Sequence, residues 1–131
     1  TANGARWFDE TQTPFGAMNG RTVILQAVRK LSEAASAITA RNNLTPEQID
    51  VVVPHQANLN LLHALGKRLN IATERIVTNV DRYGNTSGAS AYLALQQAQA
   101  EKRFRAGAYV LVLAFGAGFT WGAALCRVTE G

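Results

Sequence analysis

The sequence predicts an α/β fold in which a mixed β-sheet carries helices on both faces. Segments with helical spacing alternate with short apolar runs along most of the 131 residues, and this order is typical of helices layered on a sheet. The run from Tyr109 to Phe115 is almost continuously apolar, as expected for a buried central strand. Hydrophobic residues make up 47% and charged residues 17%, which indicates one globular domain with a sizeable core.

The chain begins with an irregular segment that leads into a long helix. Residues 1–19 are aperiodic, so we expect a lead-in there and a domain over residues 20–131. Apolar side chains recur at helical spacing between residues 20 and 41, which predicts an amphipathic helix. The residues that form this apolar face are Val23, Ala27, Leu31, Ala34, Ala35 and Ile38.

A short turn and a strand come next. Thr45 followed by Pro46 is typical of the start of a helical turn, since Thr is a good N-cap and Pro suits the first helical position. The β-branched run 49–53 predicts a buried strand, and Pro54 is expected to stop it.

The second half predicts two more helices and three more strands. Gly116-Ala117-Gly118, the glycine turn, is expected to reverse the chain between the last two strands. The order along the whole chain is then helix, strand, helix, strand, helix, strand, strand. We expect helices over 58–69 and 86–104, and strands over 76–77, 109–115 and 119–128.

His55 and Asn85 are the polar residues that could carry chemistry. Each lies at a corner that leads into a predicted helix, and ligands in such sheets usually bind beyond the carboxyl ends of the strands. A histidine in this position is more often a structural residue that caps the helix or packs in the core. The alternative is a histidine that converges with Asn85 on a pocket and holds an oxygen where negative charge develops.

Asn85 also has two interpretations. Asn, Thr and Ser are preferred helix caps, which explains the segment Asn85-Thr86-Ser87 by itself. The small residues that follow allow either close helix packing or the close approach of a ligand to the start of the helix. The glycine turn more often serves only to reverse the chain between two strands. The alternative role is to let the backbone pass close to a bound group.

Several classes of function are disfavoured. The formal net charge of +4 comes from scattered residues rather than a long basic run, so we expect no nucleic-acid binding, and an ordinary solvated surface explains the charge. No apolar run reaches the ~18 residues of a membrane span. The two histidines and the single cysteine, Cys126, do not form a zinc pattern, and we expect no metal or cofactor. The lone cysteine favours a reducing, cytoplasmic compartment, and we expect it to be buried in the last strand.

Three segments together resemble the C-terminal half of the β-ketoacyl-acyl-carrier-protein synthase III family of thiolase-fold condensing enzymes. They are Val53-Pro54-His55-Gln56-Ala57-Asn58, Tyr83-Gly84-Asn85-Thr86-Ser87 and Phe115-Gly116-Ala117-Gly118-Phe119-Thr120-Trp121-Gly122. The resemblance covers roughly residues 14–128 and implies a thiolase-like C-terminal half. It also implies condensation of an acyl-CoA with malonyl-acyl-carrier-protein, with loss of CO2.

The resemblance implies roles for individual residues. His55 and Asn85 match the His and Asn of a Cys-His-Asn triad, whose cysteine belongs to the N-terminal half and is not Cys126. The chain alone is therefore expected to be inactive. Binding of substrate or CoA is implied for Met18, Gly20, Asn58, Phe115, Gly116 and Ala117. Docking of the acidic acyl-carrier protein is implied for Lys67 and Arg68, and the parent enzyme is expected to be a homodimer.

Two residues depart from the family's pattern. Asn60 stands where members often carry an arginine for docking of the carrier protein, which makes a CoA-linked extender more plausible. Ala117 replaces a glycine in the glycine turn and is expected to narrow the pocket slightly. The alternatives are a related secondary-metabolite condensing enzyme, or a non-catalytic module for binding or dimerisation.

Overall fold

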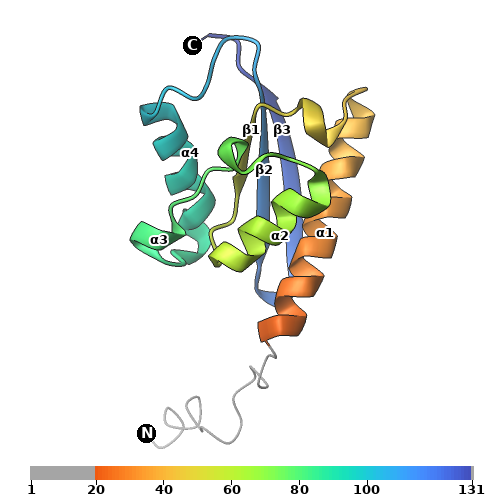
Figure 1. The fold of residues 1–131 in the computed structure, drawn as a ribbon, viewed down its shortest axis with the longest axis vertical. Coiled ribbons are helices and arrows are strands. Elements are labelled where there is room, and N and C mark those ends of the chain that lie inside the picture. Colours follow the sequence, from red (N-terminus) through yellow and green to blue (C-terminus); the bar gives the residue numbers. More distant parts are fainter. Residues whose placement is uncertain (1–19, 131) are drawn as a thin grey trace, which may run out of the picture.

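The computed structural model describes residues 20–130, which form a three-stranded sheet between two helical layers (Figure 1). The expected lead-in over residues 1–19, including Met18, lies outside the described residues. Short 3₁₀ turns at 46–48, 73–75, 87–89 and 117–119 join the main elements. In chain order the main elements are α1 (Gly20–Arg41), β1 (Val51–Pro54), α2 (Leu59–Leu69), α3 (Val80–Tyr83), α4 (Ser90–Ala100), β2 (Tyr109–Gly116) and β3 (Thr120–Arg127).

The sheet is mixed, as predicted, with β2 in the middle. β1 runs parallel to β2, with Val52 opposite Leu111, and β3 runs antiparallel to β2, with Ala124 opposite Val112. The central position of β2 agrees with its nearly continuous apolar sequence, and neighbouring strands and helices bury Val110, Leu111 and Leu113. Pro54 is the last residue of β1 rather than a residue beyond it.

Helices cover both faces of the sheet, which confirms the predicted layers (Figure 1). On one face α1 and α2 build the larger part of the core with Leu31, Leu62 and Leu111, all of which are buried. On the other face α4 packs its small residues Ala94 and Ala98 against β1 and the start of β2.

Two predicted elements differ from the structure. The strand expected at 76–77 is reduced to a single bridge between Ile76 and Val52, because the chain leaves a 3₁₀ turn just before this point and enters α3 soon afterwards. The helix expected over 86–104 is shorter, and its first turn is 3₁₀. Positive φ angles at Ser87 (53°) and Lys102 (54°) are incompatible with α-helix and set these limits.

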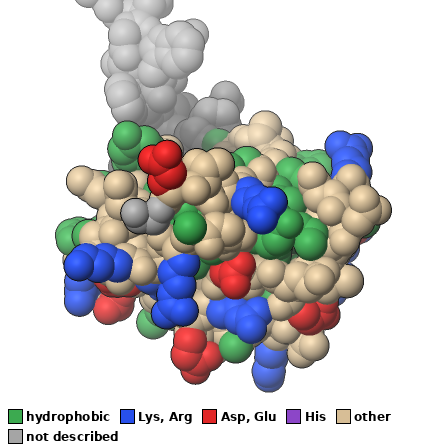
Figure 2. Space-filling model, turned by 90° about the horizontal axis from the view of Figure 1, so that it is seen from above, with side chains coloured by type: hydrophobic (Ala, Val, Ile, Leu, Met, Phe, Trp, Pro, Cys, Tyr) green, Lys and Arg blue, Asp and Glu red, His purple; other side chains and the backbone are tan. Residues whose placement is uncertain are grey.

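Charged side chains are scattered over the end of the molecule where β1 and β2 begin. Figure 2 shows Lys and Arg side chains mixed with Asp and Glu on this face, together with some hydrophobic ones, and no histidine. This distribution agrees with the solvated surface expected from the sequence. Within residues 20–130, no helix combines the length and the apolar character that crossing a membrane requires.

Candidate active site

A cavity of about 790 Å³ lies at the carboxyl ends of β1 and β2, where α1, α2 and the start of α4 also meet. It contains seven of the eight catalytic and substrate-binding residues that the sequence predicted, the eighth being Met18 outside the described residues. Its lining residues are Gly20, Val23, Ile24, Ala27, His55, Ala57, Asn58, Leu61, Asn85, Ser87, Gly88, Ala91, Ala114, Phe115, Gly116 and Ala117.

His55 is held at the end of β1 by its backbone and by its ring. The backbone N–H donates to the carbonyl of Leu113 at 2.7 Å, which continues the pairing of β1 with β2 for one residue past the strand. The ring Nδ1 lies 2.5 Å from the hydroxyl of Ser90, in the first turn of α4. Because the ring is half-buried, desolvation lowers the pKa of His55 from its ordinary value of 6.5. The imidazole is therefore mainly neutral at pH 7.

Asn85 lies in the loop that leaves α3, not at the end of a strand. Gly84 ends α3 with φ 66° and ψ −161°, a conformation that side chains with a Cβ rarely adopt. The Oδ1 atom of Asn85 accepts a hydrogen bond from the N–H of Ser87 at 2.9 Å. This contact leaves the Nδ2 amide of Asn85 as a donor for a molecule in the cavity.

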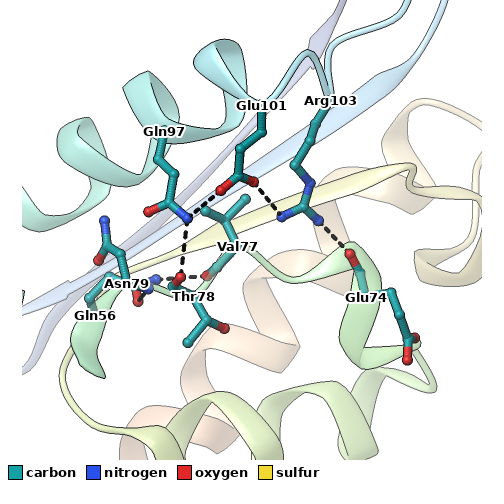
Figure 3. Close-up of polar contacts among 8 residues, drawn as sticks. All are labelled: Gln56, Glu74, Val77, Thr78, Asn79, Gln97, Glu101 and Arg103. Atoms are coloured by element: carbon teal, nitrogen blue, oxygen red, sulfur yellow. Dashed lines mark hydrogen bonds and ion pairs between the residues drawn. The ribbon is translucent and has the colours of Figure 1, made fainter. Parts of the chain in front are cut away.

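Gln56 joins the segments that carry these two residues, and sequence analysis assigned it no role. Its side chain is completely buried, and both the nitrogen and the oxygen of its amide group make hydrogen bonds (Figure 3). Nε2 donates to the carbonyls of Pro54 and Val77 at 3.0 and 2.9 Å, and Oε1 accepts from the N–H of Asn79 at 2.9 Å. A second N–H, that of Val80, reaches the same oxygen at 3.2 Å. The start of α3 is thereby fixed to the end of β1.

Further polar contacts tie the segment before α3 to α4. Gln97 donates to the carbonyl of Thr78 at 3.3 Å and to Glu101 at 2.8 Å (Figure 3). Arg103, which follows α4, donates to the carbonyl of Glu74 and lies 3.8 Å from Glu101. Polar residues followed by a helix occur in many sequences, so no local signal distinguishes Gln56 or Ser90 from surface residues. Only their burial in the fold identifies them.

The remaining walls of the cavity are largely apolar. Helix α1 contributes Val23, Ile24 and Ala27, and the end of β2 contributes Phe115. The glycine turn closes this side, with Gly118 at a positive φ of 72°. Phe115 contacts Phe119 edge-on, with ring centroids 6.1 Å apart, so the turn folds back beside the cavity.

Some predicted residues occupy other places or have structural roles. Asn58 caps α2 because its Oδ1 atom accepts a hydrogen bond from the N–H of Leu61 at 2.9 Å, and it also lines the cavity. Lys67 and Arg68 are exposed in the last turn of α2 and do not line the cavity. Cys126 is exposed, not buried as expected, because it lies on the edge strand β3 where α4 does not reach.

The chemistry of the cavity is that of neutral hydrogen-bond donors in an apolar setting. His55 is the only titratable side chain among the described residues that line it, and Asn85 supplies a donor that does not change its charge. Such donors stabilise negative charge on an oxygen that forms during a reaction. Among residues 20–130 there is no group of three or more His, Cys, Asp or Glu side chains placed to hold a metal ion.

Comparison with known proteins identifies relatives of this chain. Residues 39–128 match the family model for the 3-oxoacyl-[acyl-carrier-protein] synthase III C terminal. The β-ketoacyl-[acyl-carrier-protein] synthase III of Nitratidesulfovibrio vulgaris (strain DP4) is 50% identical over 113 residues, which are 86% of this chain and 34% of that protein. The chain thus spans about a third of the length of this curated relative.

Solved structures agree with the family model. The 3-oxoacyl-[acyl-carrier-protein] synthase III from Aquifex aeolicus VF5 superimposes with a TM-score of 0.81 at 40% identity, over 84% of this chain and 36% of that one. The priming β-ketosynthase from the R1128 polyketide biosynthetic pathway gives a TM-score of 0.76 at 32% identity, over 87% of this chain and 34% of that one.

Proposed function

Because the chain belongs to the 3-oxoacyl-[acyl-carrier-protein] synthase III family and has the thiolase-like fold of its C-terminal part, we propose that it is the C-terminal catalytic domain of such a condensing enzyme. The enzyme joins an acyl-CoA primer to malonyl-acyl-carrier-protein with loss of CO2, the first condensation of fatty acid synthesis. One observation carries this proposal. His55 and Asn85, from segments thirty residues apart, line one apolar cavity with Phe115 and the glycine turn.

The proposed role of this domain is stabilisation of charge during decarboxylation. When CO2 leaves the malonyl thioester, the electron pair of the broken C–C bond spreads onto the thioester oxygen. His55 and the Nδ2 amide of Asn85 both donate hydrogen bonds to that oxygen. The resulting carbanion attacks the carbonyl carbon of an acyl thioester on the enzyme, which forms the new C–C bond, breaks the C–S bond and releases the enzyme's thiolate. Removing one donor of this kind typically lowers the rate by ~10²–10³-fold.

The nucleophile that carries the acyl group comes from outside this chain. Cys126, the only cysteine, pairs with Val110 in the sheet, four residues before Ala114 at the cavity. At ~3.3 Å per residue this places it about 13 Å from the site along the strand. We therefore propose that an N-terminal half supplies the catalytic cysteine and that the isolated chain does not catalyse condensation.

The exposed Lys67 and Arg68 on α2 are proposed to dock the acidic acyl-carrier protein. The similarity to a priming polyketide β-ketosynthase favours a second candidate, a condensing enzyme of secondary metabolism. Both candidates use the same cavity and the same decarboxylation, and they differ in the acyl primer.

Intact-mass spectrometry of the complete synthase and of this chain, with a short acyl-CoA followed by malonyl-acyl-carrier-protein, tests the proposal. The complete enzyme should gain the acyl mass and then form a 3-oxoacyl product, whereas this chain should do neither. Asn85→Asp keeps the oxygen that accepts from Ser87 but removes the Nδ2 donor. It should still be acylated and then lose ~10²–10³-fold in decarboxylation. A complete enzyme that is never acylated would leave a non-catalytic binding module as the better description.

A further inference from the structure

Ser90 is a buried serine whose hydroxyl makes two contacts that together determine where its hydrogen points. Its side chain is at the start of α4 and only 1% exposed. The Oγ atom accepts a hydrogen bond from the backbone N–H of Gln56 at 3.0 Å. A backbone N–H can only donate, so this contact uses a lone pair of the oxygen and leaves the hydroxyl hydrogen available.

The second contact is with the ring of His55. The hydroxyl oxygen lies 2.5 Å from Nδ1, and either atom could in principle carry the shared hydrogen. If Nδ1 were protonated, the hydroxyl hydrogen would have no other acceptor among the residues that the structure describes. Buried donors without a partner are costly, so the hydroxyl donates to an unprotonated Nδ1.

From these contacts we infer that Ser90 is a positioning residue that holds His55 in the tautomer with its proton on Nε2. The lowered pKa of His55 keeps the ring mainly neutral at pH 7, and a neutral imidazole carries a single N–H. Since Nδ1 faces Ser90, Nε2 is the nitrogen left for a molecule in the cavity. The role in catalysis rests on the proposed function, whereas the tautomer can be measured independently.

The hydroxyl of Ser90 contacts two parts of the site. Through Gln56 it fixes the backbone that follows His55, and through Nδ1 it fixes the orientation of the ring. Without it the imidazole could rotate or place its proton on Nδ1, and Nε2 would then accept rather than donate. Nε2 would then face the developing oxyanion with a lone pair, which repels it, instead of with an N–H that donates a hydrogen bond.

Nitrogen-15 NMR of the histidine rings tests the tautomer directly in the labelled chain. The chain has two histidines, and His63, exposed on α2, is an internal reference in the same spectrum. At neutral pH, His55 should show a protonated Nε2 and an unprotonated Nδ1 that accepts a hydrogen bond. A proton on Nδ1, or a tautomer average equal to that of His63, would overturn the inference whatever the activity of the enzyme.

Substitutions separate positioning from simple packing. Ser90→Ala should shift His55 toward a tautomer mixture, and Ser90→Thr, which keeps the hydroxyl, should restore the wild-type ring signals. Ser32→Ala is the matched control, because Ser32 is also a buried serine on a helix but donates to the carbonyl of Val28. It should leave the His55 signals unchanged. An unchanged tautomer in folded Ser90→Ala would contradict the role.

Kinetics of the complete synthase provide the functional readout. Ser90→Ala should lower kcat for decarboxylation roughly tenfold, the effect of about one hydrogen bond, with little change in KM and with normal acylation of the nucleophile. Equal loss in Ser90→Thr would count against positioning through the hydroxyl. If the complete protein catalyses no condensation while the NMR result holds, the proposed function fails and the tautomer assignment stands.

Discussion

At the scale of single residues, the chemistry of the site depends on which polar atoms already make hydrogen bonds within the protein. The Oδ1 atom of Asn85 is bonded to Ser87 and the Nδ1 atom of His55 contacts Ser90, so each residue has one nitrogen left for a molecule in the cavity that both line. These contacts convert two side chains that can donate or accept into directed donors. Sequence identified both residues, but the direction of each hydrogen bond follows only from its neighbours in the fold.

The lowered pKa of His55 predicts a dependence of stability on pH. Burial keeps the folded-state pKa below the ordinary 6.5, so near and below pH 6.5 the unfolded chain binds the proton more readily than the folded chain. The contribution of neutral His55 to the free energy of unfolding is fully present above pH 6.5 and is lost as pH falls through the folded-state pKa.

Denaturant unfolding above and below pH 6.5 measures this dependence. His55→Gln should flatten the fall in the free energy of unfolding at low pH relative to wild type. His63→Gln, a change at an exposed position on α2, is the control and should keep the wild-type slope. Equal slopes for wild type and His55→Gln would contradict the predicted shift.

At the scale of elements, two loops carry the candidate catalytic residues and one buried amide joins them. Gln56 follows β1 and reaches across to the segment that starts α3, so the loop with Asn85 is held relative to the strand that places His55. A loop fixed in this way has little freedom to move without breaking buried hydrogen bonds.

Gln56→Leu should therefore destabilise the domain strongly for a polar-to-apolar change in the core. It leaves the carbonyls of Pro54 and Val77 and the N–H groups of Asn79 and Val80 without the contacts they make to Gln56. We expect a loss of at least about 3 kcal/mol in the free energy of unfolding. Gln96→Leu, on the exposed side of α4, should change it by less than about 0.5 kcal/mol. Similar losses in both variants would refute the bridging role.

The charge on α2 gives a prediction about partner choice. Asn60 and Lys67 are both exposed and are seven residues apart on this helix, so they lie on one face, two turns from each other. In the complete enzyme, Lys67→Glu should raise KM for malonyl-acyl-carrier-protein roughly two- to fivefold, as expected for exposed charges, and leave KM for malonyl-CoA unchanged. Asn60→Arg should lower KM for the carrier-protein substrate. No effect of either change would place the docking surface elsewhere.

At the scale of the whole molecule, the two faces of the sheet are covered unequally. Helix α1 packs along β2 and β3, whereas α4 packs mainly on β1 and the start of β2. On the side of α4, the paired residues Ala114 and Gly122, with Ala124, remain exposed within the described part of the chain. These small residues, on and beside the edge strand β3, form a surface suited to packing against another layer.

We expect the chain to self-associate through this uncovered face. Sedimentation velocity should show an apparent mass that rises with protein concentration, and Ala124→Glu should reduce it by placing a charge in the middle of the face. Ala37→Glu, on the exposed side of α1, is a matched control that makes the same substitution elsewhere. A monodisperse monomer at every concentration would show that this face is stable in water.

The sequence by itself determined the α/β class, the long helix α1 and the central strand β2, and it predicted His55 and Asn85 as candidate catalytic residues. Periodicity and apolar runs report burial over many residues, and each of the three segments that carry the family resemblance is an unbroken stretch of sequence. Its predictions for 76–77 and for the helix after Asn85 were wrong in extent, because positive φ angles and a single bridge leave no periodic signal.

Only the tertiary structure decided the roles of Gln56 and Ser90, the exposure of Cys126 and the shared cavity. Gln56 contacts residues 21 to 24 positions away, and Ser90 contacts residues 34 and 35 positions away. The free energy of a buried hydrogen bond depends on partners that folding brings together, and such partners cannot be read from local composition. Cys126 is exposed for a related reason: an apolar strand is buried only where another layer covers it.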